Sequence, residues 1–390
     1  MKKTVHEWDH VAQIASYYGF KFVDIPPLSK DDALHVKNVL KQNPFERKSH
    51  TTSHAPLFKV DEKIALLRAF GKESVIMSQP TMVLSRIAQK KETIEFSLDI
   101  IGTTRSIAEA LLIKTSRAIL EEEGYLDFSV TLNSIGDRDS AQRFERDIWN
   151  YYKKKIAELP HACKDHIRKN PITHTCNDEV CQAIQHDAPR SLGFLSEHAR
   201  NHFKEVLEFI ETINIPYTID QTLFGHKECF AQTLFELKTK EPGDEKDFVC
   251  GFGFRYNPLS RRLGYKKDVP AVGLSCAYKR LKSKIKLKKP KPAQFYFIQL
   301  GFEAKLKSLT VIENLRKWGI PILHALARDK ITGQISSAEH MNLPFVIIMG
   351  QKEAMENSVV VRDAETRAQE TVTLEDLPHY LIRIHEKSSM

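Results

Sequence analysis

The chain has 390 residues, of which 42% are hydrophobic and 28% charged, and its formal net charge at pH 7 is +8. This composition is typical of a globular protein with two or three domains. No apolar run approaches the roughly 20 residues that a membrane-spanning helix needs. Six cysteines are too few for a disulfide framework, and the two N-terminal lysines have no apolar segment behind them, so a cytoplasmic protein without a secretory signal is expected.

The positive charge is concentrated in one stretch of the chain. Residues 279–291 hold eight cations and no acid: Lys279, Arg280, Lys282, Lys284, Lys286, Lys288, Lys289 and Lys291. Without them the chain is formally neutral, so its basic character is a local feature. Such a cluster suits a polyanion, most simply RNA phosphates. The alternative is a solvated helix face that leads into the Pro-Lys-Pro linker.

Helices and strands alternate through the first third of the chain. Residues 5–20 have apolar groups at helical spacing, and Gly19 is the expected end of this helix. The segment FKFVDIPPL is expected to be a strand that ends at its two prolines. Residues 106–125 predict an amphipathic helix, and residues 126–139 predict a strand followed by a turn.

Residues 138–215 are almost entirely helical and charged in pattern, and they contain a group of metal-ligand residue types. The spacing Cys-x2-His…His-x-Cys-x4-Cys could supply a tetrahedral zinc site from Cys163, His166, His174, Cys176 and Cys181. The interpretation preferred from the sequence is that these are free cysteines and surface histidines of a reduced helical segment. No metal is therefore expected.

Residues 295–390 alternate strands and helices again. FYFIQL, PILHAL and FVIIMG predict buried strands, and AKLKSLTVIENLRKWG and ISSAEHMN predict helices. A hairpin-like pair, VVVRDAETRAQETV, follows, so the order implies a mixed sheet with helices on it. Phe295, Tyr296 and Phe297 are expected to be core strand residues.

Residues 250–281, CGFGFRYNPLSRRLGYKKDVPAVGLSCAYKRL, combine a Gly-rich turn, an Arg-Tyr pair on a strand and a second strand that enters a helix. The helix is predicted by apolar residues at helical spacing: Leu274, Ala277, Leu281 and Ile285. An arginine in such a segment suits a bound phosphate or carboxylate, because its planar fork binds these groups bidentately.

These segments resemble class II histidyl-tRNA synthetases. GFRYNPL resembles the family's Gly-Gly-Arg-Tyr-Asp-Gly-Leu, and PAVGLSCAYKRL resembles the third class-defining motif, which places Arg280 at the ATP-contacting arginine. FKFVDIPPL resembles the first class II motif, whose proline lies at a dimer interface, so a homodimer is implied. Asn257, Ala277 and Lys279 replace the family's Asp, Gly and Glu.

The resemblance implies an α+β class II synthetase-like core, built on an antiparallel sheet with helices and interrupted by a helical insertion. A C-terminal α/β anticodon-binding-like domain is implied after a basic linker. The expected divisions are the core in two parts, 1–137 and 216–281, the insertion at 138–215, the linker at 282–294 and the C-terminal domain at 295–390.

The residues that would hold the amino acid depart from the family pattern. PLFKVDEKIALLRAF can be laid on the family segment that supplies a glutamate and a threonine to histidine, and Asp61 and Lys63 stand at those positions. A lysine adds bulk and positive charge to a pocket for an α-ammonium and an imidazole, and like charges repel the substrate. Arg255 and Tyr256 belong to the same implied pocket.

The segment YTIDQTLFGHKECFAQTLFEL resembles the family's histidine-specific region, aligned on its Thr-Leu-Phe-Glu. The family arginine that stabilises developing negative charge falls on Gly225, which has no side chain to do so. The family's Asp falls on Glu228 and its two tyrosines fall on Cys229 and Phe230.

The implied ATP site is also altered. PTMVLSRIAQKKETIEFSLDIIG resembles the second class II motif, with Arg86 as the α-phosphate contact, while Ala88 replaces an acidic residue. The loop that follows is about five residues shorter than in the family, which removes positioning of ATP and of the acceptor end. The vestigial ATP-binding set is therefore Arg86, Glu236 and Arg280, although Arg86 is equally a plain surface arginine.

The leading hypothesis is a histidyl-tRNA synthetase-like protein that cannot aminoacylate and binds tRNA or another RNA as a homodimer, with no cofactor. One alternative is an active divergent ligase that uses ATP and magnesium. Another is a regulatory subunit like the synthetase-derived partner of ATP phosphoribosyltransferase, against which the C-terminal domain argues, because such subunits typically lack it.

Overall fold

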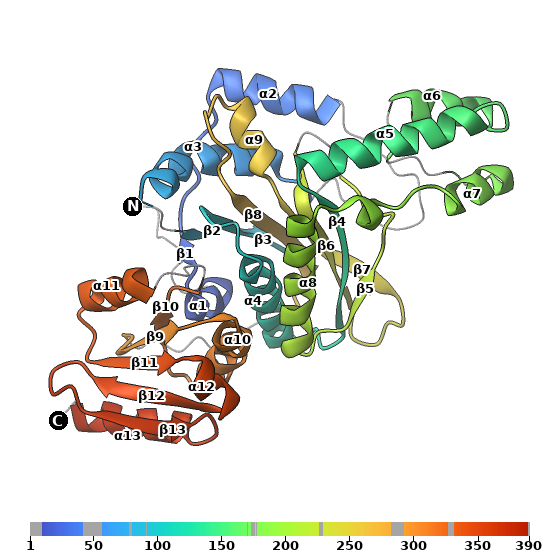
Figure 1. Cartoon of the computed structure of the whole chain (residues 1–390). Coiled ribbons are helices and arrows are strands. Elements are labelled where there is room, and N and C mark those ends of the chain that lie inside the picture. Colours follow the sequence, from blue (N-terminus) through green and yellow to red (C-terminus); the bar gives the residue numbers. More distant parts are fainter. Residues whose placement is uncertain are drawn as a thin grey trace.

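The computed structural model describes residues 10–41, 57–77, 80–90, 92–169, 171–172, 176, 178–225, 229–281, 292–326 and 331–388. Figure 1 draws the chain as two bodies, a larger one built on a long sheet and a smaller C-terminal one. No helix within the described ranges is both long and apolar enough to cross a membrane.

The larger body is built on one mixed sheet in which, within the described ranges, eight strands pair in the order β1-β2-β3-β8-β7-β6-β4-β5. The six central strands, β2-β3-β8-β7-β6-β4 in sheet order, each pair antiparallel with their neighbours in this series. The two edge pairs, β1 with β2 and β4 with β5, are parallel. This confirms the predicted antiparallel core. The strands are β1 Lys21–Phe22, β2 Thr81–Lys90, β3 Thr93–Ile101, β4 Phe128–Gly136, β5 Tyr217–Ile219, β6 Ala231–Lys240, β7 Asp247–Arg255 and β8 Ala271–Lys279.

Helices cover both faces of this sheet. One face packs against α1 His10–Tyr17, α4 Ile107–Glu123 and α8 Glu197–Thr212, and the other against α2 Lys30–Lys41, α3 Val60–Met77 and α9 Asn257–Arg262. Because side chains alternate along a strand, each central strand contributes residues to two separate apolar cores, one on each side of the sheet. We call the side covered by α4 the α4 face and the side covered by α3 the α3 face.

The helix predicted from Leu274 onward is wrong for Leu274 and Ala277, because both lie in strand β8, whereas Ile285 lies outside the described residues. Residues 271–276 are all buried, since β8 lies between β3 and β7 with helices over both faces. The sequence of a strand that is buried on both sides is a continuous apolar run. Such a run cannot be distinguished from a buried helix by periodicity alone. The helix predicted over 106–125 is confirmed as α4, and it ends at Gly124 in the left-handed conformation.

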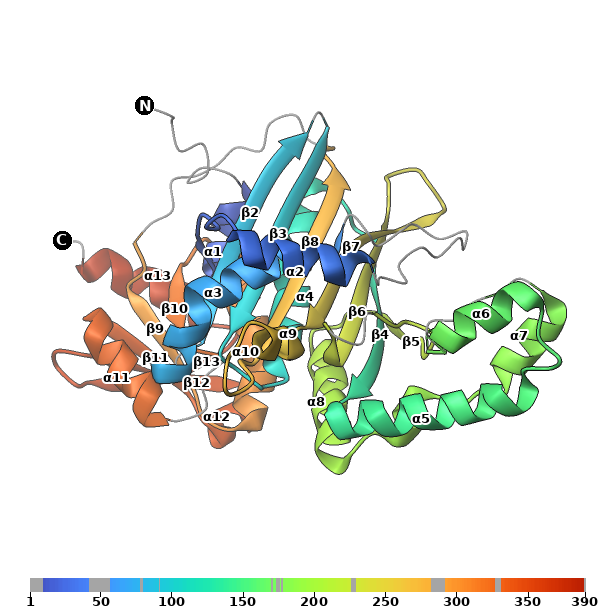
Figure 2. The same cartoon turned by 90° about the horizontal axis from the view of Figure 1, so that it is seen from above.

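Residues 138–215 contain the predicted helices. They are α5 Arg138–Lys155, α6 His161–Lys169, α7 Glu179–His186, the 3-10 turn Ser191–Phe194 and α8. Figure 2 shows α5, α6 and α7 projecting together from the sheet, and a small core of their own holds them. Helix α8 instead packs on α4 and belongs to the core of the larger body.

The C-terminal body has a second mixed sheet in the order β10-β9-β11-β12-β13. Strands β9, β10 and β11 are parallel, and β12 and β13 form the predicted antiparallel pair. The elements are β9 Phe295–Gln299, α10 Phe302–Lys317, β10 Ile322–His324, α11 Ile331–Met341, β11 Phe345–Met349, α12 Gln351–Met355, β12 Ser358–Asp363, β13 Gln369–Thr373 and α13 Leu377–Ser388. Phe295, Tyr296 and Phe297 are buried, as predicted.

Buried polar contacts join the two bodies. The Tyr18 hydroxyl donates to Glu313 of α10, which also accepts from Arg316 Nε at 2.9 Å. Burial opposes ionisation of Glu313, but Arg316 and Lys114 lower its pKa to about 2. His324 of β10 lies against Gly19, where an added Cβ would stand 3.2 Å from the ring, and both ring nitrogens are buried.

His324 makes this junction sensitive to acid. Burial lowers its pKa to about 4, against 6.5 for an ordinary histidine. A depressed pKa means that protonation of His324 favours the unfolded chain. The contribution of neutral His324 to the free energy of unfolding is therefore complete above pH 6.5 and is lost as pH falls toward 4. From pH 7 to pH 5 we expect the free energy of unfolding to fall by roughly 2 kcal/mol through this group alone.

Denaturant unfolding of His324→Leu should show a shallower decline between pH 7 and pH 5 than the unchanged chain. His186→Leu is the control, because the side chain of His186 is 86% exposed and should leave the slope unaltered. If the free energy of unfolding fell equally between pH 7 and pH 5 in all three proteins, the assignment of this pH dependence to His324 would be contradicted.

Candidate functional site

A buried ion pair lies between the sheet and α3, on the α3 face. Lys63 Nζ stands 2.8 Å from Asp99 Oδ1 and 3.0 Å from Oδ2, and both side chains have zero exposure. The Tyr256 hydroxyl donates to Asp99 Oδ1 at 2.9 Å. The structure therefore brings together two residues predicted for the amino-acid pocket, Lys63 and Tyr256, around an acid that the sequence analysis missed.

The electrostatics of this group follow from its burial. Burial raises the pKa of Asp99, while the nearby Lys63 charge and the Tyr256 hydrogen bond act in the opposite direction. Burial and the neighbouring Asp99 carboxylate raise the pKa of Tyr256 well above 10, so its hydroxyl keeps its proton and donates it. A buried carboxylate is tolerated only when its oxygens are satisfied, and here two donors contact Oδ1 directly.

Gly273 of β8 provides the space for this pair. A Cβ there would lie 2.0 Å from Asp99 Oδ1 and 2.7 Å from Lys63 Nζ, so any side chain would displace both groups. A second polar layer lies next to it, where Ser97 donates to Glu62 at 2.9 Å and lies 3.0 Å from the Ser275 hydroxyl.

Aromatic rings fill the rest of this region. Phe58 lies 5.3 Å from Phe230 and 5.2 Å from Phe254, and Phe230 meets Phe254 edge-on at 4.5 Å. The ring of Phe230 also occupies the space beside Gly225, where a Cβ would lie 1.5 Å from it. Cys229 is fully buried in the same cluster. The predicted pocket positions Cys229 and Phe230 thus belong to packed core, and Gly225 lies half-buried beside it.

Arg255, the last residue of β7, contacts the α4 face, whereas Tyr256, the N-cap of α9, contacts Asp99 on the α3 face. Its Nε and Nη2 donate to Glu109 of α4 at 2.6 and 2.7 Å, and its other N–H groups reach the carbonyls of Thr103 and Arg105. Although burial acts against it, the charges of Arg255 and His202 lower the pKa of Glu109 to about 2. Arg255 therefore stabilises the α4 face and does not share a pocket with Tyr256.

Two of the three predicted ATP residues, Glu236 and Arg86, lie in one row across the sheet. Glu236 of β6, Ser97 of β3 and Arg86 of β2 occupy one register row, through Phe252 and Ser275. Glu236 is 7% exposed, and Arg280 follows β8, where its backbone N–H donates to the Glu92 carbonyl. The side chain of Arg86 lies outside the described part of the structure.

The remaining predicted residues are only partly described. Asp61 is exposed on α3, and Lys279 is exposed with its Nζ 3.9 Å from Glu92. Outside the described residues lie Glu228 and the cluster members Lys282, Lys284, Lys286, Lys288, Lys289 and Lys291.

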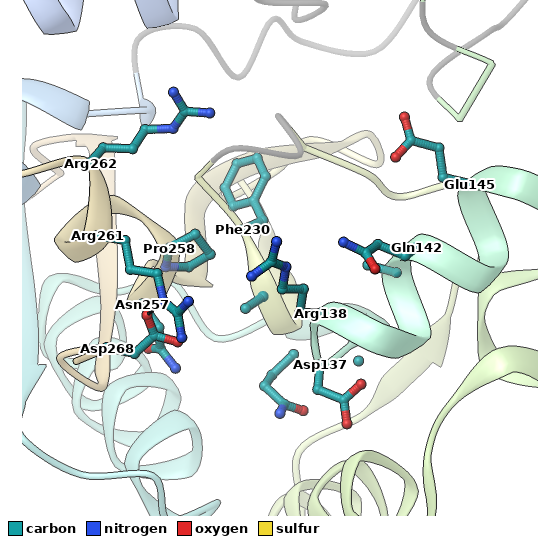
Figure 3. A pocket seen from close by; sticks show the side chains of 14 residues that line it. Asp137, Arg138, Gln142, Glu145, Phe230, Asn257, Pro258, Arg261, Arg262 and Asp268 are labelled. Atoms are coloured by element: carbon teal, nitrogen blue, oxygen red, sulfur yellow. Dashed lines mark hydrogen bonds and ion pairs between the residues drawn. The ribbon is translucent and has the colours of Figure 1, made fainter. Parts of the chain in front are cut away.

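An open cavity of about 600 Å³ adjoins the filled region, between the start of α5, the start of β6 and α9. Figure 3 shows Phe230 in its wall between Arg138 and Pro258. The same ring packs on Phe254, whose ring lies 6.0 Å from that of Tyr256. Among the lining residues Arg261 is already ion-paired to Asp268. The sequence analysis did not identify this cavity.

Three of the cysteines singled out from the sequence converge in the insertion. The sulfurs of Cys163, Cys176 and Cys181 all lie within 4.8 Å of one another. His166 is exposed on α6, and its ring nitrogens are not part of that group. His174 lies outside the described residues.

Comparisons with known proteins agree with this architecture. Residues 294–384 match the family model described as "Anticodon binding domain". The chain is 26% identical over 331 residues to the histidine–tRNA ligase of Bacillus velezensis, which covers 80% of this chain and 78% of that protein. It is 22% identical over 398 residues to that of Caldanaerobacter subterraneus subsp. tengcongensis, covering 95% and 94%.

One solved structure shares the fold over most of the chain. The apo histidyl-tRNA synthetase of S. aureus superposes with a TM-score of 0.51 at 20% identity, covering 94% of this chain and 92% of that one.

The tight packing at Gly273 gives a direct stability test. Gly273→Ala should lower the free energy of unfolding by about 3 kcal/mol, because the methyl group must push apart a buried ion pair. Gly193→Ala is the control, since a Cβ there meets nothing within 4 Å. Equal denaturation midpoints for the two variants would contradict the described packing.

The ion pair itself can be tested by a double-mutant cycle. Lys63→Met leaves the Asp99 carboxylate buried without its cation and should cost about 3–5 kcal/mol. Adding Asp99→Asn removes that charge while keeping an acceptor for Tyr256, so the double variant should recover at least half of the loss. Lys59→Met is the control, because Lys59 pairs with Glu95 at 3.3 Å near the surface and should cost under about 1 kcal/mol.

Proposed function

We propose that this chain, which belongs to the class II histidyl-tRNA synthetase-like family, does not activate histidine and instead binds tRNA or another RNA. The observation that carries the first half is the Lys63–Asp99 pair, which fills the region where the family resemblance places the amino acid. The second half is supported by the match of residues 294–384 to an anticodon-binding domain.

Lys63 acts as an internal substitute for a cationic ligand. A substrate that carries an ammonium and an imidazole needs acceptors, and Asp99 already receives Lys63 and Tyr256. To bind there, histidine would have to displace a cation that is part of the chain and therefore loses no translational freedom in binding. The displaced Lys63 would then remain buried beside a second positive charge.

The space beside Gly225 supports the same conclusion. The family arginine at this position supplies positive charge to the reacting phosphate, and removing one such preorganised group typically costs orders of magnitude in rate. Here the neighbouring volume is taken by the ring of Phe230, which is itself held by Phe58 and Phe254. Replacing Gly225 alone with arginine would therefore clash with this cluster before it could restore any charge contact.

RNA binding in this proposal rests on the C-terminal domain together with the basic residues 279–291. The C-terminal domain itself is close to neutral, so it contributes shape and base contacts, whereas the basic residues contribute attraction to phosphates. The protein acts as a homodimer and requires neither ATP nor magnesium for binding. Residues 1–137 and 216–281 form a core that serves as scaffold.

The enzymatic half is tested by histidine-dependent ATP–pyrophosphate exchange. We expect no exchange above the protein-free rate, with the Bacillus velezensis ligase measured alongside as a positive control. Exchange that depends on histidine would overturn this half and favour an active divergent ligase. Size determination in solution checks the homodimer separately.

The RNA half is tested by binding of total tRNA across a salt series. We expect measurable binding. The logarithm of the association constant should fall linearly with the logarithm of the salt concentration. Replacing Lys279 and the downstream lysines with alanine should lower the affinity and reduce the slope, whereas replacing the exposed Lys204 on α8 should change neither. No binding at low salt would contradict the proposal, and co-purification with a phosphoribosyltransferase would favour the regulatory-subunit alternative.

A further inference from the structure

The helical insertion holds a cluster of three cysteine sulfurs that the proposed function does not use. Cys163 lies on α6, Cys176 lies between α6 and α7, and Cys181 lies in the first turn of α7. Their sulfurs are mutually within 4.8 Å, and those of Cys163 and Cys176 are 3.2 Å apart. Zinc–sulfur bonds of about 2.3 Å place tetrahedral ligand sulfurs roughly 3.8 Å from one another, so one ion can reach all three with small adjustments.

Backbone contacts hold two of these sulfurs in position. The Asp178 N–H donates to Cys176 Sγ at 3.4 Å, and the Asp178 carboxylate accepts from the Cys181 N–H at 3.0 Å as the N-cap of α7. The first contact would stabilise a thiolate at Cys176, and the second fixes the turn that presents Cys181. Such contacts around ligand atoms orient them and tune their affinity for metal.

The part of the molecule that carries the cluster has little else to hold it together. Helix α6 has 9 residues and α7 has 8, and helices this short are marginal without tertiary packing. Their shared core is small, and Cys163 and Cys181 are themselves members of it. Figures 1 and 2 both show α6 and α7 together at the end of the insertion, away from the main sheet. A crosslink between α6 and α7 is what small units of this kind commonly require.

We propose that the insertion binds one structural zinc ion through the thiolates of Cys163, Cys176 and Cys181, with His166 as the fourth ligand. His166 follows Cys163 by one helical turn, so both side chains leave the same face of α6. Its ring is exposed and its nitrogens lie outside the sulfur group, so ligation requires a change of its side-chain rotamer. Binding releases the three thiol protons to solvent and involves no redox step.

A disulfide is the competing use of these residues. The 3.2 Å separation of Cys163 and Cys176 is far longer than a sulfur–sulfur bond of about 2.05 Å. A disulfide would use only two of the three neighbouring thiols, whereas one metal ion can bind all three sulfurs. The other cysteines are buried outside the insertion, at Cys229, Cys250 and Cys276, which makes them suitable controls.

The test is the metal content of the full chain purified without chelator, measured by elemental analysis. We expect about one zinc per chain, and substitution with cobalt should give thiolate-to-cobalt charge-transfer absorption. Cys176→Ser should reduce the bound zinc at least tenfold. Cys250→Ser should retain it, because Cys250 lies on β7, outside the insertion, where its Sγ donates to the Leu237 carbonyl at 3.4 Å.

Structural consequences separate this site from a chance association of metal with surface thiols. Chelation should make the insertion susceptible to limited proteolysis while the C-terminal domain stays intact, and added zinc should reverse it. His166→Ala should weaken zinc binding and alter the cobalt spectrum, whereas the exposed His186 changed to Ala should do neither. Equal zinc content in Cys176→Ser and the unchanged chain would overturn the site, as would a Cys163–Cys176 disulfide in protein that contains no zinc. Full zinc affinity in His166→Ala would overturn the assignment of the fourth ligand.

These outcomes do not depend on whether the chain activates histidine or binds RNA. Zinc content and protease protection are read directly from the protein, so failure of either proposal leaves the other open to its own test.

Discussion

The buried contact between Lys63 and Asp99 constrains the whole α3 face of the sheet. Two opposite charges with no exposure can persist in a protein interior only when each finds its partner at close range, because desolvation otherwise costs several kcal/mol per ion. The surrounding structure meets this demand with a glycine at position 273, which leaves room for the pair, and with Tyr256, which supplies a further donor. Aromatic rings pack beside the pair, from Phe58 and Phe230 through Phe254 to Tyr256.

Two neighbouring residues, the last of β7 and the N-cap of α9, have different tasks. Tyr256 contacts Asp99 on the α3 face, while Arg255 contacts Glu109 on the α4 face. Each face thus contains its own buried charge cluster, with different partners and no shared ligand space. The open cavity near Arg138 has Phe230 in its wall, and the same ring packs on Phe254 in the aromatic cluster.

The sequence predicted much of this architecture and part of the site. Alternation and helical spacing were sufficient for α4 and for the C-terminal domain, since those segments have one clear apolar face or short buried strands. Lys63 and Tyr256 were identified because they stand at positions where the family pattern implies substrate contacts. Asp99 was not, because a single acid in an apolar strand carries no local signal and its partner lies 36 residues away on a helix.

Two further differences have physical causes of the same kind. The part of β8 from Leu274 onward was predicted as a helix because burial on both faces removes the alternation that normally distinguishes a strand. The cysteine spacing was visible in the sequence, but the convergence of three sulfurs depends on how α6 packs against α7. Side-chain partners that are distant in sequence are set by tertiary packing, which local patterns do not contain.

The central claim is that Lys63 takes the place of the amino acid. Calorimetric titration of histidine into the purified protein tests it most directly, at histidine concentrations up to about 1 mM, the upper end of ordinary substrate affinities. The account predicts no heat beyond that of dilution. Saturable binding of one histidine per chain would show that the pocket opens despite the ion pair, and it would contradict the account.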